Sequence, residues 1–309
     1  MKIFVAGATG VLGRPTVQAL VTAGHGVRGA ARGEEKAGLL RTLGAEPVAV
    51  DIFDPTATRQ ALAGCEALIN LATKIPPLMR MRRRSAWAEN DRLRSEASRV
   101  LAEAAKEAGV GLYVQESITF IYADGGKQWL TEDSPLDVSW ISLQSMLNAE
   151  RVTREFAEGG RRGINLRFGA FYAPYAQSTL DTARLARRRL FPVPGRANNY
   201  FSSIHVDDAA SAVAASLNLS PGEYNVVDNE PLTQREYADA VTQALGAPRA
   251  RRIPAWLFRI VGGGPASYIL RSQRVTNARF KPGHRLVAPA PERPRGLAAG
   301  GGEHHQRVR

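Results

Sequence analysis

Short apolar runs alternate with longer segments of helical periodicity through the first 168 residues. The apolar runs span residues 3–6, 25–31, 46–50, 67–72, 112–115 and 165–168. Continuous runs of this length are typical of strands that are buried on both faces of a sheet. Helical segments at 15–23, 85–108 and 142–159 lie between them. The alternation predicts an α/β fold with a doubly wound parallel sheet.

Three glycines, Gly7, Gly10 and Gly13, follow the first apolar run at a spacing of three residues. Gly7 allows a sharp turn off the strand, Gly10 removes a side chain that would block a phosphate, and Gly13 lets the next helix pack close to the sheet. The free N–H groups at the start of that helix favour a bound pyrophosphate. The triplet alone is a weak signal, but its place between a strand and a helix predicts a dinucleotide site.

The ends of the following strands predict the rest of this site, because open α/β sheets bind ligands at the carboxyl ends of their strands. Arg32 closes the second run and Lys36 follows it, which suits the 2′-phosphate of NADP; an acidic residue there would favour NAD. We therefore expect NADP, with NAD as the alternative. Asp51 closes the third run, where a carboxylate binds adenine or caps a helix. The expected cofactor contacts so far are Gly7, Thr9, Gly10, Val11, Leu12, Gly13, Arg32, Asp51, Ile52, Leu71, Ala72, Thr73 and Gln115.

The regular alternation of apolar runs and helical segments ends after residue 168. Residues 169–203 are rich in aromatic residues, arginine, glycine and proline, as expected of a segment that folds over a pocket. Thr233 and Glu236 predict a capping box at the start of a later helix. We expect a dinucleotide-binding domain at 1–168, to which 204–228 returns, and a substrate-binding part at 169–203 and 229–280. Residues 281–309 show no periodicity and predict an irregular tail.

The composition of the chain limits the classes of binding partner that we expect. The 309 residues carry a net charge of +12, mostly from arginine. The arginine runs at 80–84, 187–189 and 249–252 are spread over distant segments and lack interleaved aromatic residues, so we expect no nucleic-acid partner. We also expect no membrane partner, because no apolar run is long enough to span a bilayer. We expect no signal peptide, because Lys2 is followed directly by the first strand and the glycine turn, and we expect no metal site. The single cysteine, Cys65, excludes an internal disulfide and fits a reducing cytoplasm.

Three motifs occur in order along the chain: GATGVLG at 7–13, LRFGAFYAP at 166–174 and FSSIHVDD at 201–208. Together they resemble the extended short-chain dehydrogenase/reductases of the epimerase/dehydratase type, over about residues 1–280. The resemblance implies a Rossmann domain that binds NAD(P), a small substrate domain, and Phe168 and Phe171 beside the nicotinamide. It also implies that His205 and Asp207 are structural and hold the start of a helix.

The catalytic Tyr-x-x-x-Lys pair of that family is missing. None of the eight tyrosines has a lysine four residues on, and the two positions fall at Ser142 and Met146. Ala170 stands where sugar-nucleotide enzymes of the family carry an asparagine. Loss of a general acid costs about 10²–10⁴-fold, which hydride transfer survives if the donor is well placed. The candidate catalytic residues are Ser117, Thr119 and Lys74, because each could donate a hydrogen bond to a developing alkoxide or relay a proton from water.

Within the family, the chain resembles atypical ketoreductases that tailor aromatic polyketide antibiotics such as angucyclinones. This resemblance implies NADPH-dependent reduction of a ketone on a polycyclic aromatic substrate, and we expect a monomer or homodimer. The rings expected to line the substrate pocket are Tyr172, Phe191, Tyr200 and Phe201. The missing pair suggests an alternative, a non-catalytic NADP-binding sensor or scaffold. A sugar-nucleotide epimerase or dehydratase fits less well, because epimerisation needs a base and an acid at one carbon.

Overall fold

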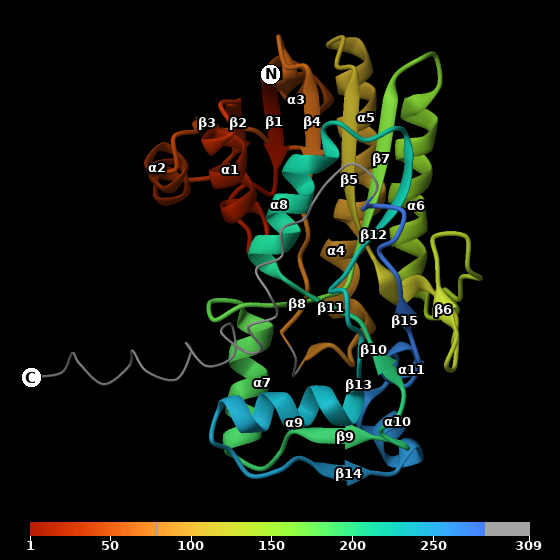
Figure 1. Cartoon of the computed structure of the whole chain (residues 1–309). Helices are drawn as coiled ribbons and strands as arrows, with labels where there is room; N and C mark the ends of the chain where they lie inside the picture. The colour runs from red at the N-terminus through yellow and green to blue at the C-terminus, as the bar shows by residue number, and fades with distance from the viewer. Residues whose placement is uncertain (78–79, 282–309) are drawn as a thin grey trace, which may run out of the picture.

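The computed structural model describes residues 1–77 and 80–281, and its centre is a seven-stranded sheet. The strands are β1 (Lys2–Ala6), β2 (Gly26–Ala30), β3 (Glu46–Val48), β4 (Ala67–Asn70), β5 (Leu112–Ile118), β7 (Arg162–Phe168) and β12 (Gly222–Val226). Their order is β12-β7-β5-β4-β1-β2-β3, and every neighbouring pair is parallel. This order confirms the doubly wound parallel sheet (Figure 1).

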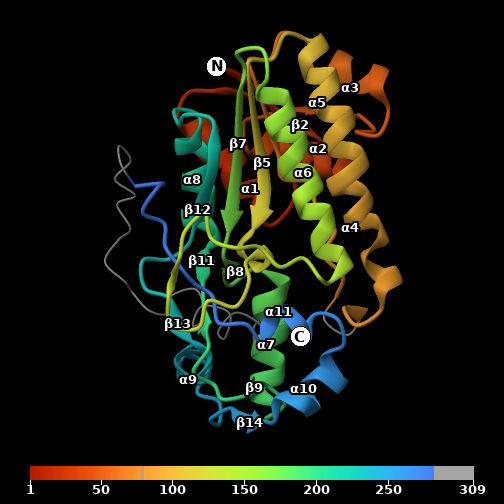
Figure 2. The same cartoon turned by 90° about the vertical axis from the view of Figure 1, so that its right-hand side faces the viewer.

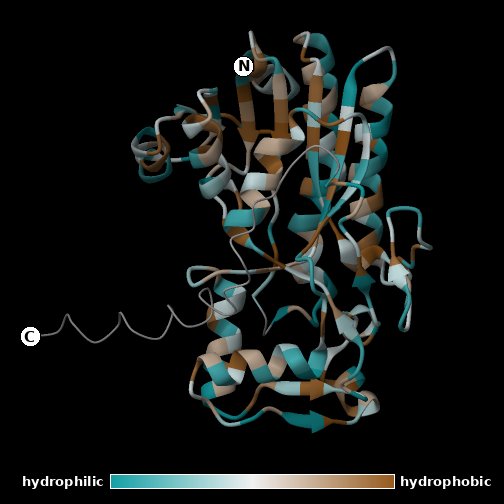
Figure 3. Ribbon diagram, in the orientation of Figure 1, coloured by the Kyte–Doolittle hydropathy of each residue, from teal (hydrophilic) through white to brown (hydrophobic). Residues whose placement is uncertain are grey.

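Two helical layers cover the sheet, one on each face (Figure 2). The first contains α1 (Gly13–Thr22), α2 (Glu34–Thr42) and α8 (Val206–Ser216), and the second contains α3 (Pro55–Leu62), α5 (Ser98–Glu107) and α6 (Ile141–Ala157). Alternate residues of β1 supply the two cores, since Ile3 and Val5 pack with the first layer while Phe4 and Ala6 pack with the second. The apolar segments of Figure 3 accordingly concentrate on the strands of the sheet.

The long helix expected at 85–108 forms, but it is not regular. It consists of η2 (Arg84–Trp87), α4 (Ala88–Arg92), a π-helical turn η3 (Leu93–Ala97) and α5. The wider turn contains Arg94, whose buried Nη2 lies 2.6 Å from Glu116 Oε2 on β5. Burial raises the pKa of Glu116, and the charge of Arg94 opposes that rise. The irregular turn therefore accompanies a buried ion pair between helix and sheet.

A second group of elements, here called the small lobe, lies beyond the carboxyl ends of the strands (Figure 1). It contains α7 (Gln177–Arg187), β9 (Pro192–Pro194), β10 (Tyr200–Phe201), β13 (Leu232–Thr233), α9 (Gln234–Ala244), β14 (Arg251–Ile253), α10 (Ala255–Gly262) and α11 (Ala266–Ile269). The capping box of Thr233 and Glu236 is confirmed at the start of α9.

Shorter strands join the small lobe to the large sheet. A two-stranded ladder of β8 (Ala170–Tyr172) and β11 (Ser203–His205) leads into the lobe, and β6 (Trp129–Leu130) pairs with β15 (Arg274–Val275). The turn η4 (Thr119–Ile121) follows β5. The predicted irregular tail lies outside the described residues from 282 onward.

Candidate cofactor and substrate site

The glycine turn lies at the carboxyl end of β1, on the sheet edge that faces the small lobe (Figure 1). Gly7 has a φ of +78°, and a Cβ there would lie 2.6 Å from the carbonyl carbon of Leu71. A Cβ on Gly13 would lie 2.0 Å from the carbonyl oxygen of Gly7. Both positions therefore need glycine because β1, α1 and the end of β4 approach closely, as the sequence predicted for Gly7 and Gly13.

Gly10 differs from the other two glycines because it borders open space. The one atom within 4 Å of a Cβ built there is the carbonyl oxygen of Gly7, at 3.2 Å. No side chain of the described residues caps the adjacent first turn of α1, and that turn holds no acidic residue. Thr9 and Val11 are half-buried beside the turn, while Leu12 is buried. An accessible backbone at an uncapped helix start fits a dinucleotide pyrophosphate.

Arg32 is exposed just beyond β2 and has no ion pair among the described residues. Gly33 follows with a φ of +87° and begins α2. The nearest acidic residue along the chain, Glu34, is paired with Arg41 instead, with Arg41 Nη1 2.6 Å from Glu34 Oε1. The guanidinium of Arg32 is thus available for an anionic ligand at this edge.

Two carboxylates follow β3, Asp51 and Asp54, and their surroundings differ. Asp54 caps α3, because its Oδ1 accepts hydrogen bonds from two N–H groups of the first turn at 2.9 and 3.1 Å. Asp51 is exposed, and its Oδ1 accepts from the N–H of Phe53 at 3.1 Å. Ile52 is half-buried against the core of the second helical layer. Helix capping is therefore the role of Asp54, and Asp51 stays a predicted adenine contact.

The chain beyond β4 runs along the glycine turn. Leu71 is buried and Ala72 is half-buried, whereas Thr73 and Lys74 are exposed. The backbone N–H of Lys74 donates to Asn90 Oδ1 at 3.1 Å, but its ammonium group has no partner among the described residues. Within the described part of the chain, the Lys74 ammonium group is therefore unpaired and exposed beyond the end of β4.

Ser117 is fully buried at the end of β5, and its hydroxyl donates to Glu150 Oε1 at 2.7 Å. Glu150 lies on α6 and accepts from Nε and Nη2 of Arg167, each at 2.8 Å. Nη1 of Arg167 donates to the phenol oxygen of Tyr122 at 2.9 Å, and this phenol donates to Asn225 Oδ1 at 2.7 Å. The buried network ties β5, β7 and β12 together, and the Ser117 proton is directed at a carboxylate within it.

Gln115 and Thr119 are also buried, at 2% and 1% exposed. The Oε1 of Gln115 accepts from the Tyr113 hydroxyl and from Asn70 Nδ2, at 2.8 and 2.9 Å. Its Nε2 donates to the carbonyl oxygen of Glu116 at 2.8 Å. The amide of Gln115 is thus used inside the protein, and the roles expected of Gln115 and Thr119 stay predictions.

The positions of the missing Tyr-x-x-x-Lys pair fall in the first two turns of α6. Ser142 and Met146 are buried, and the Ser142 hydroxyl has no hydrogen-bond partner among the described residues. Met146 belongs to an apolar cluster with Ile121, Leu143 and Tyr268, of which Tyr268 comes from the small lobe. Burial raises the pKa of the Tyr268 phenol. A phenol therefore lies near these positions, but without a lysine that would lower its pKa.

Six aromatic rings, here called the aromatic row, form a continuous series from the Rossmann part into the small lobe. In the order Trp87, Trp140, Tyr268, Phe120, Phe201 and Tyr237, the ring centroids are 4.9, 5.3, 5.1, 6.3 and 4.9 Å apart. Among the predicted substrate residues, Phe201 belongs to the row and Phe191 packs in a cluster with Tyr237. Tyr200 instead lies against Arg274, whose guanidinium carbon is 4.9 Å from the ring centroid.

Tyr172, the fourth predicted substrate residue, lies beside a buried carboxyl group. Burial raises the pKa of Asp228 to about 6, and the charge of Asp208 adds to the rise. The Ser203 hydroxyl donates to Asp228 Oδ2 at 3.0 Å. Burial and then the charge of Asp228 raise the pKa of the Tyr172 phenol. The phenol thus stays protonated and donates a hydrogen bond toward the carboxylate.

The motifs at 201–208 and 166–174 complete the set on which the family resemblance rests. His205 caps α8, its Nδ1 accepting from the N–H of Asp207 at 3.3 Å, which confirms a structural role. Phe168 is buried in the core and Phe171 is half-buried, with their ring centroids 5.3 Å apart. Their place beside a nicotinamide stays a prediction.

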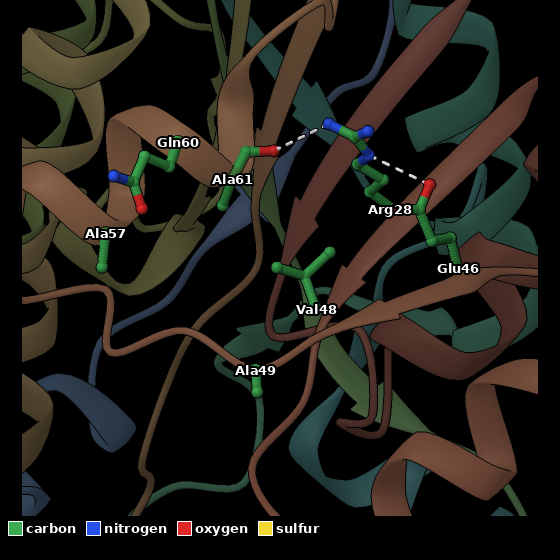
Figure 4. Close-up of a pocket in the computed structure, with 7 residues that line it drawn as sticks. All are labelled: Arg28, Glu46, Val48, Ala49, Ala57, Gln60 and Ala61. Carbon is green, nitrogen blue, oxygen red and sulfur yellow. Dashed lines mark hydrogen bonds and ion pairs between the residues drawn. The ribbon is translucent and has the colours of Figure 1, made fainter.

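A shallow pocket opens at the β3 edge of the sheet (Figure 4). Its lining residues are Arg28, Glu46, Val48, Ala49, Ala57, Gln60 and Ala61. Arg28 spans it, since Nε donates to Glu46 Oε2 at 3.0 Å and Nη1 to the carbonyl oxygen of Ala61 at 3.3 Å. None of these residues is an expected cofactor or substrate contact. Within residues 1–77 and 80–281, no helix has the length and apolar character to cross a membrane, and no three His, Cys, Asp or Glu residues are placed to hold a metal.

The family is established by comparison with known proteins. Residues 3–226 match the NAD dependent epimerase/dehydratase family, and the chain belongs to this family. The residues that match include the glycine turn, the Ser117–Glu150–Arg167 network and the His205 cap. The family is named for NAD, which agrees with the dinucleotide fit of the glycine turn.

The curated relatives of the chain include several reductases by name, of which two are described here. A 3-diazoavenalumate denitrifying reductase from a Streptomyces species is 34% identical over 275 residues, which cover 85% of this chain and 88% of that protein. The 4-hydroxy-2-methyl-3-oxo-4-farnesyl-3,4-dihydroquinoline-1-oxide ketoreductase of Stigmatella aurantiaca is 25% identical over 256 residues, or 80% of this chain and 74% of that one. A human epimerase family protein solved with NADPH has a TM-score of 0.76 at 22% identity, covering 97% of this chain and 98% of that chain. This last likeness shows the fold.

Proposed function

We propose that the chain is an NADPH-dependent oxidoreductase that transfers a hydride to a flat aromatic substrate. The observation that carries the proposal is that an uncapped glycine turn at the carboxyl end of β1 occurs together with an aromatic row that runs from the Rossmann part into the small lobe. Family membership and the reductase names of both relatives support it.

Different residues would bind the different parts of the cofactor and the substrate. The backbone at Gly10 and the first turn of α1 would hold the pyrophosphate, and Arg32 would hold the 2′-phosphate and so favour NADPH over NADH. The bound cofactor supplies the hydride. The half-buried rings of the aromatic row, such as Phe120 and Phe201, would offer flat apolar surfaces to a planar substrate. Ser117 donates to Glu150 and so ties the end of β5 to α6.

We further propose that the hydride acceptor is a ketone on a polycyclic aromatic polyketide. An alkoxide that forms at such a carbonyl needs a hydrogen-bond or proton donor. Lys74 is the predicted catalytic residue whose charged group is free to reach it, whereas the hydroxyl of Ser117 is committed to Glu150 and Thr119 is buried. Lys74 therefore takes the donor role in this proposal.

The test is NADPH oxidation by the full chain with a panel of polycyclic aromatic ketones. We expect turnover, and we expect Lys74→Met to lower kcat by about 10²-fold with little change in KM, because it removes a donor and not a binding surface. Lys127→Met, an exposed lysine in the turn before β6, is the matched control and should be unaffected. Absence of turnover across the panel refutes ketone reduction, and full activity of Lys74→Met refutes the role of Lys74.

The name of the Streptomyces relative favours a second candidate for the hydride acceptor. The Streptomyces relative is named as a denitrifying reductase of a diazo compound. Hydride transfer to the ring carbon of an aryl diazonium ion breaks the C–N bond and releases N₂, so the products are the arene, N₂ and NADP⁺. This step needs no proton from the protein, which agrees with the missing Tyr-x-x-x-Lys pair. Release of N₂ from an aryl diazonium substrate, unaffected by Lys74→Met, would favour this acceptor over the ketone.

A further inference from the structure

Two of the arginine runs that are far apart in the sequence meet on the small lobe. β9 and β14 pair in parallel with Pro192 opposite Arg251, so the 187–189 run, just before β9, and the 249–252 run, which includes part of β14, lie near each other. The strand β14 and the helix α10 that follows it form the lower end of the molecule (Figures 1 and 2). The third run reaches this end too, since Arg82 Cβ lies 3.5 Å from a Cβ built on Gly263, next to α10.

Apolar side chains without a covering element lie beside these arginines. Trp256 and Ile260 are one helical turn apart on α10, and 62% and 63% of their surfaces are exposed. Val261 is 56% exposed, and none of the eight residues of α10 is buried. Leu190, just before β9, is 63% exposed. An exposed helix of this apolar character is typical of an interaction site.

The positive charges of this end are only partly neutralised. Arg249 is paired with Asp239 of α9, with Nη2 2.8 Å from Oδ2. Arg251, Arg252 and Arg259 are exposed and form no ion pair among the described residues. Arg252 donates through Nε to the carbonyl oxygen of Gly195. Three arginines without an ion pair in the described part of the chain therefore lie on β14 and α10, the latter of which also carries the exposed apolar side chains Trp256, Ile260 and Val261.

We propose that this face, formed by Arg251, Arg252, Trp256, Arg259, Ile260 and Val261, docks on an anionic lipid surface. The proposal departs from our expectation of no membrane partner, because that expectation rests on the lack of a spanning apolar run, and docking on a surface needs none. The apolar side chains of α10 would enter the boundary between headgroups and acyl chains, while the arginines meet lipid phosphates. A nucleic acid suits the face less well, because Ile260 and Val261 would lie against a charged backbone and Trp256 alone offers a stacking surface. The face lies at the far end of the small lobe from the sheet edge, so docking leaves the glycine turn accessible (Figure 1).

The experiment is co-sedimentation of the full chain with phosphatidylcholine vesicles that contain or lack phosphatidylglycerol. We expect binding to the anionic vesicles that falls as salt rises, with little binding to phosphatidylcholine alone. Tryptophan emission should shift to the blue on binding, and Trp256→Phe should abolish the shift. Arg251→Glu should lower the partition coefficient at least about tenfold, because it replaces an attractive charge with a repulsive one.

The matched control is Arg99→Glu on α5, which changes the net charge equally at an exposed residue far from the face. It should leave vesicle binding almost unchanged. Ile260→Ser, at an exposed position, should weaken binding and leave thermal unfolding and NADPH affinity as they were. Equal binding to both vesicle types, an equal loss from Arg99→Glu, or binding to duplex DNA with none to vesicles would each overturn the proposal.

Discussion

The Gly10→Ala substitution distinguishes two roles of the glycine turn. The turn either binds the cofactor pyrophosphate, here called the phosphate cradle, or only connects β1 to α1. The added methyl group would approach the carbonyl oxygen of Gly7 at 3.2 Å and otherwise meet open space, so the chain should fold. Gly10 has no positive φ, and alanine also restricts the unfolded chain. We expect the free energy of unfolding to change by less than about 1 kcal/mol, which is a shift of at most about 4 °C in Tm.

Cofactor affinity should respond much more strongly. The methyl group would occupy the space where a pyrophosphate approaches the backbone, at the cost of at least one charge-assisted hydrogen bond. Such a bond is worth about 1.5–3 kcal/mol, and each 1.4 kcal/mol is tenfold in Kd. We therefore expect Gly10→Ala to raise the Kd for NADPH by about 10- to 100-fold.

The assay pairs a fluorescence titration with NADPH and a thermal melt on each variant. Gly13→Ala is the contrasting variant, because its Cβ would lie 2.0 Å from a backbone oxygen and should destabilise the fold by about 3 kcal/mol or more. Gly38→Ala, within α2 and with nothing within 4 Å, is the control for cofactor affinity, which it should leave unchanged, while it stabilises the helix slightly. Wild-type affinity in Gly10→Ala would refute the phosphate cradle, and unfolding of Gly10→Ala would refute the reasoning on its surroundings.

Three further substitutions test other parts of the site. Arg32→Glu should weaken NADPH more than NADH in the same titration, because it removes the partner of the 2′-phosphate; an equal loss for both would contradict that assignment. Glu150→Ala should cost about 3–5 kcal/mol in denaturant unfolding, because it leaves Arg167 buried and unpaired, whereas Ser117→Ala should cost about 1.5–3 kcal/mol. Asp228 has a pKa raised from 3.8 to about 6, so its contribution to stability is full below pH 4 and is lost as pH rises through 6. Asp228→Asn should therefore gain up to about 3 kcal/mol at pH 8 relative to the unsubstituted chain and little at pH 4; equal differences at both pH values would contradict the raised pKa.

The sequence predicts the sheet and the cofactor turn because their signals are local. A strand, a glycine triplet and a helix follow one another within about twenty residues, and each glycine has a steric reason that the structure confirms for Gly7 and Gly13. The capping box of α9 and the His205 cap are equally local. Helix ends and strand lengths differ by a few residues because hydrogen bonding, and not apolar character, ends an element.

The substrate side of the site depends on contacts that no local pattern contains. Phe120 and Tyr268 are 148 positions apart, yet their rings are 5.1 Å apart because η4 and α11 meet between the lobes. Ser117 is a plausible proton donor in the sequence, but Glu150 takes its hydroxyl proton only once α6 packs on β5. The two arginine runs near β9 and β14 likewise meet only through strand pairing. Long-range pairing is the part of the fold that apolar periodicity leaves open.

The central claim is that a dinucleotide at the glycine turn passes its hydride to a flat aromatic molecule. The most direct measurement uses NADPH with deuterium at both C4 positions and follows the deuterium into the product of a polycyclic aromatic ketone by mass spectrometry. We predict one deuterium on the new carbinol carbon, and its absence in Gly10→Val. A product without deuterium, or a chain that leaves both nicotinamide cofactors unbound and unoxidised, would contradict the claim.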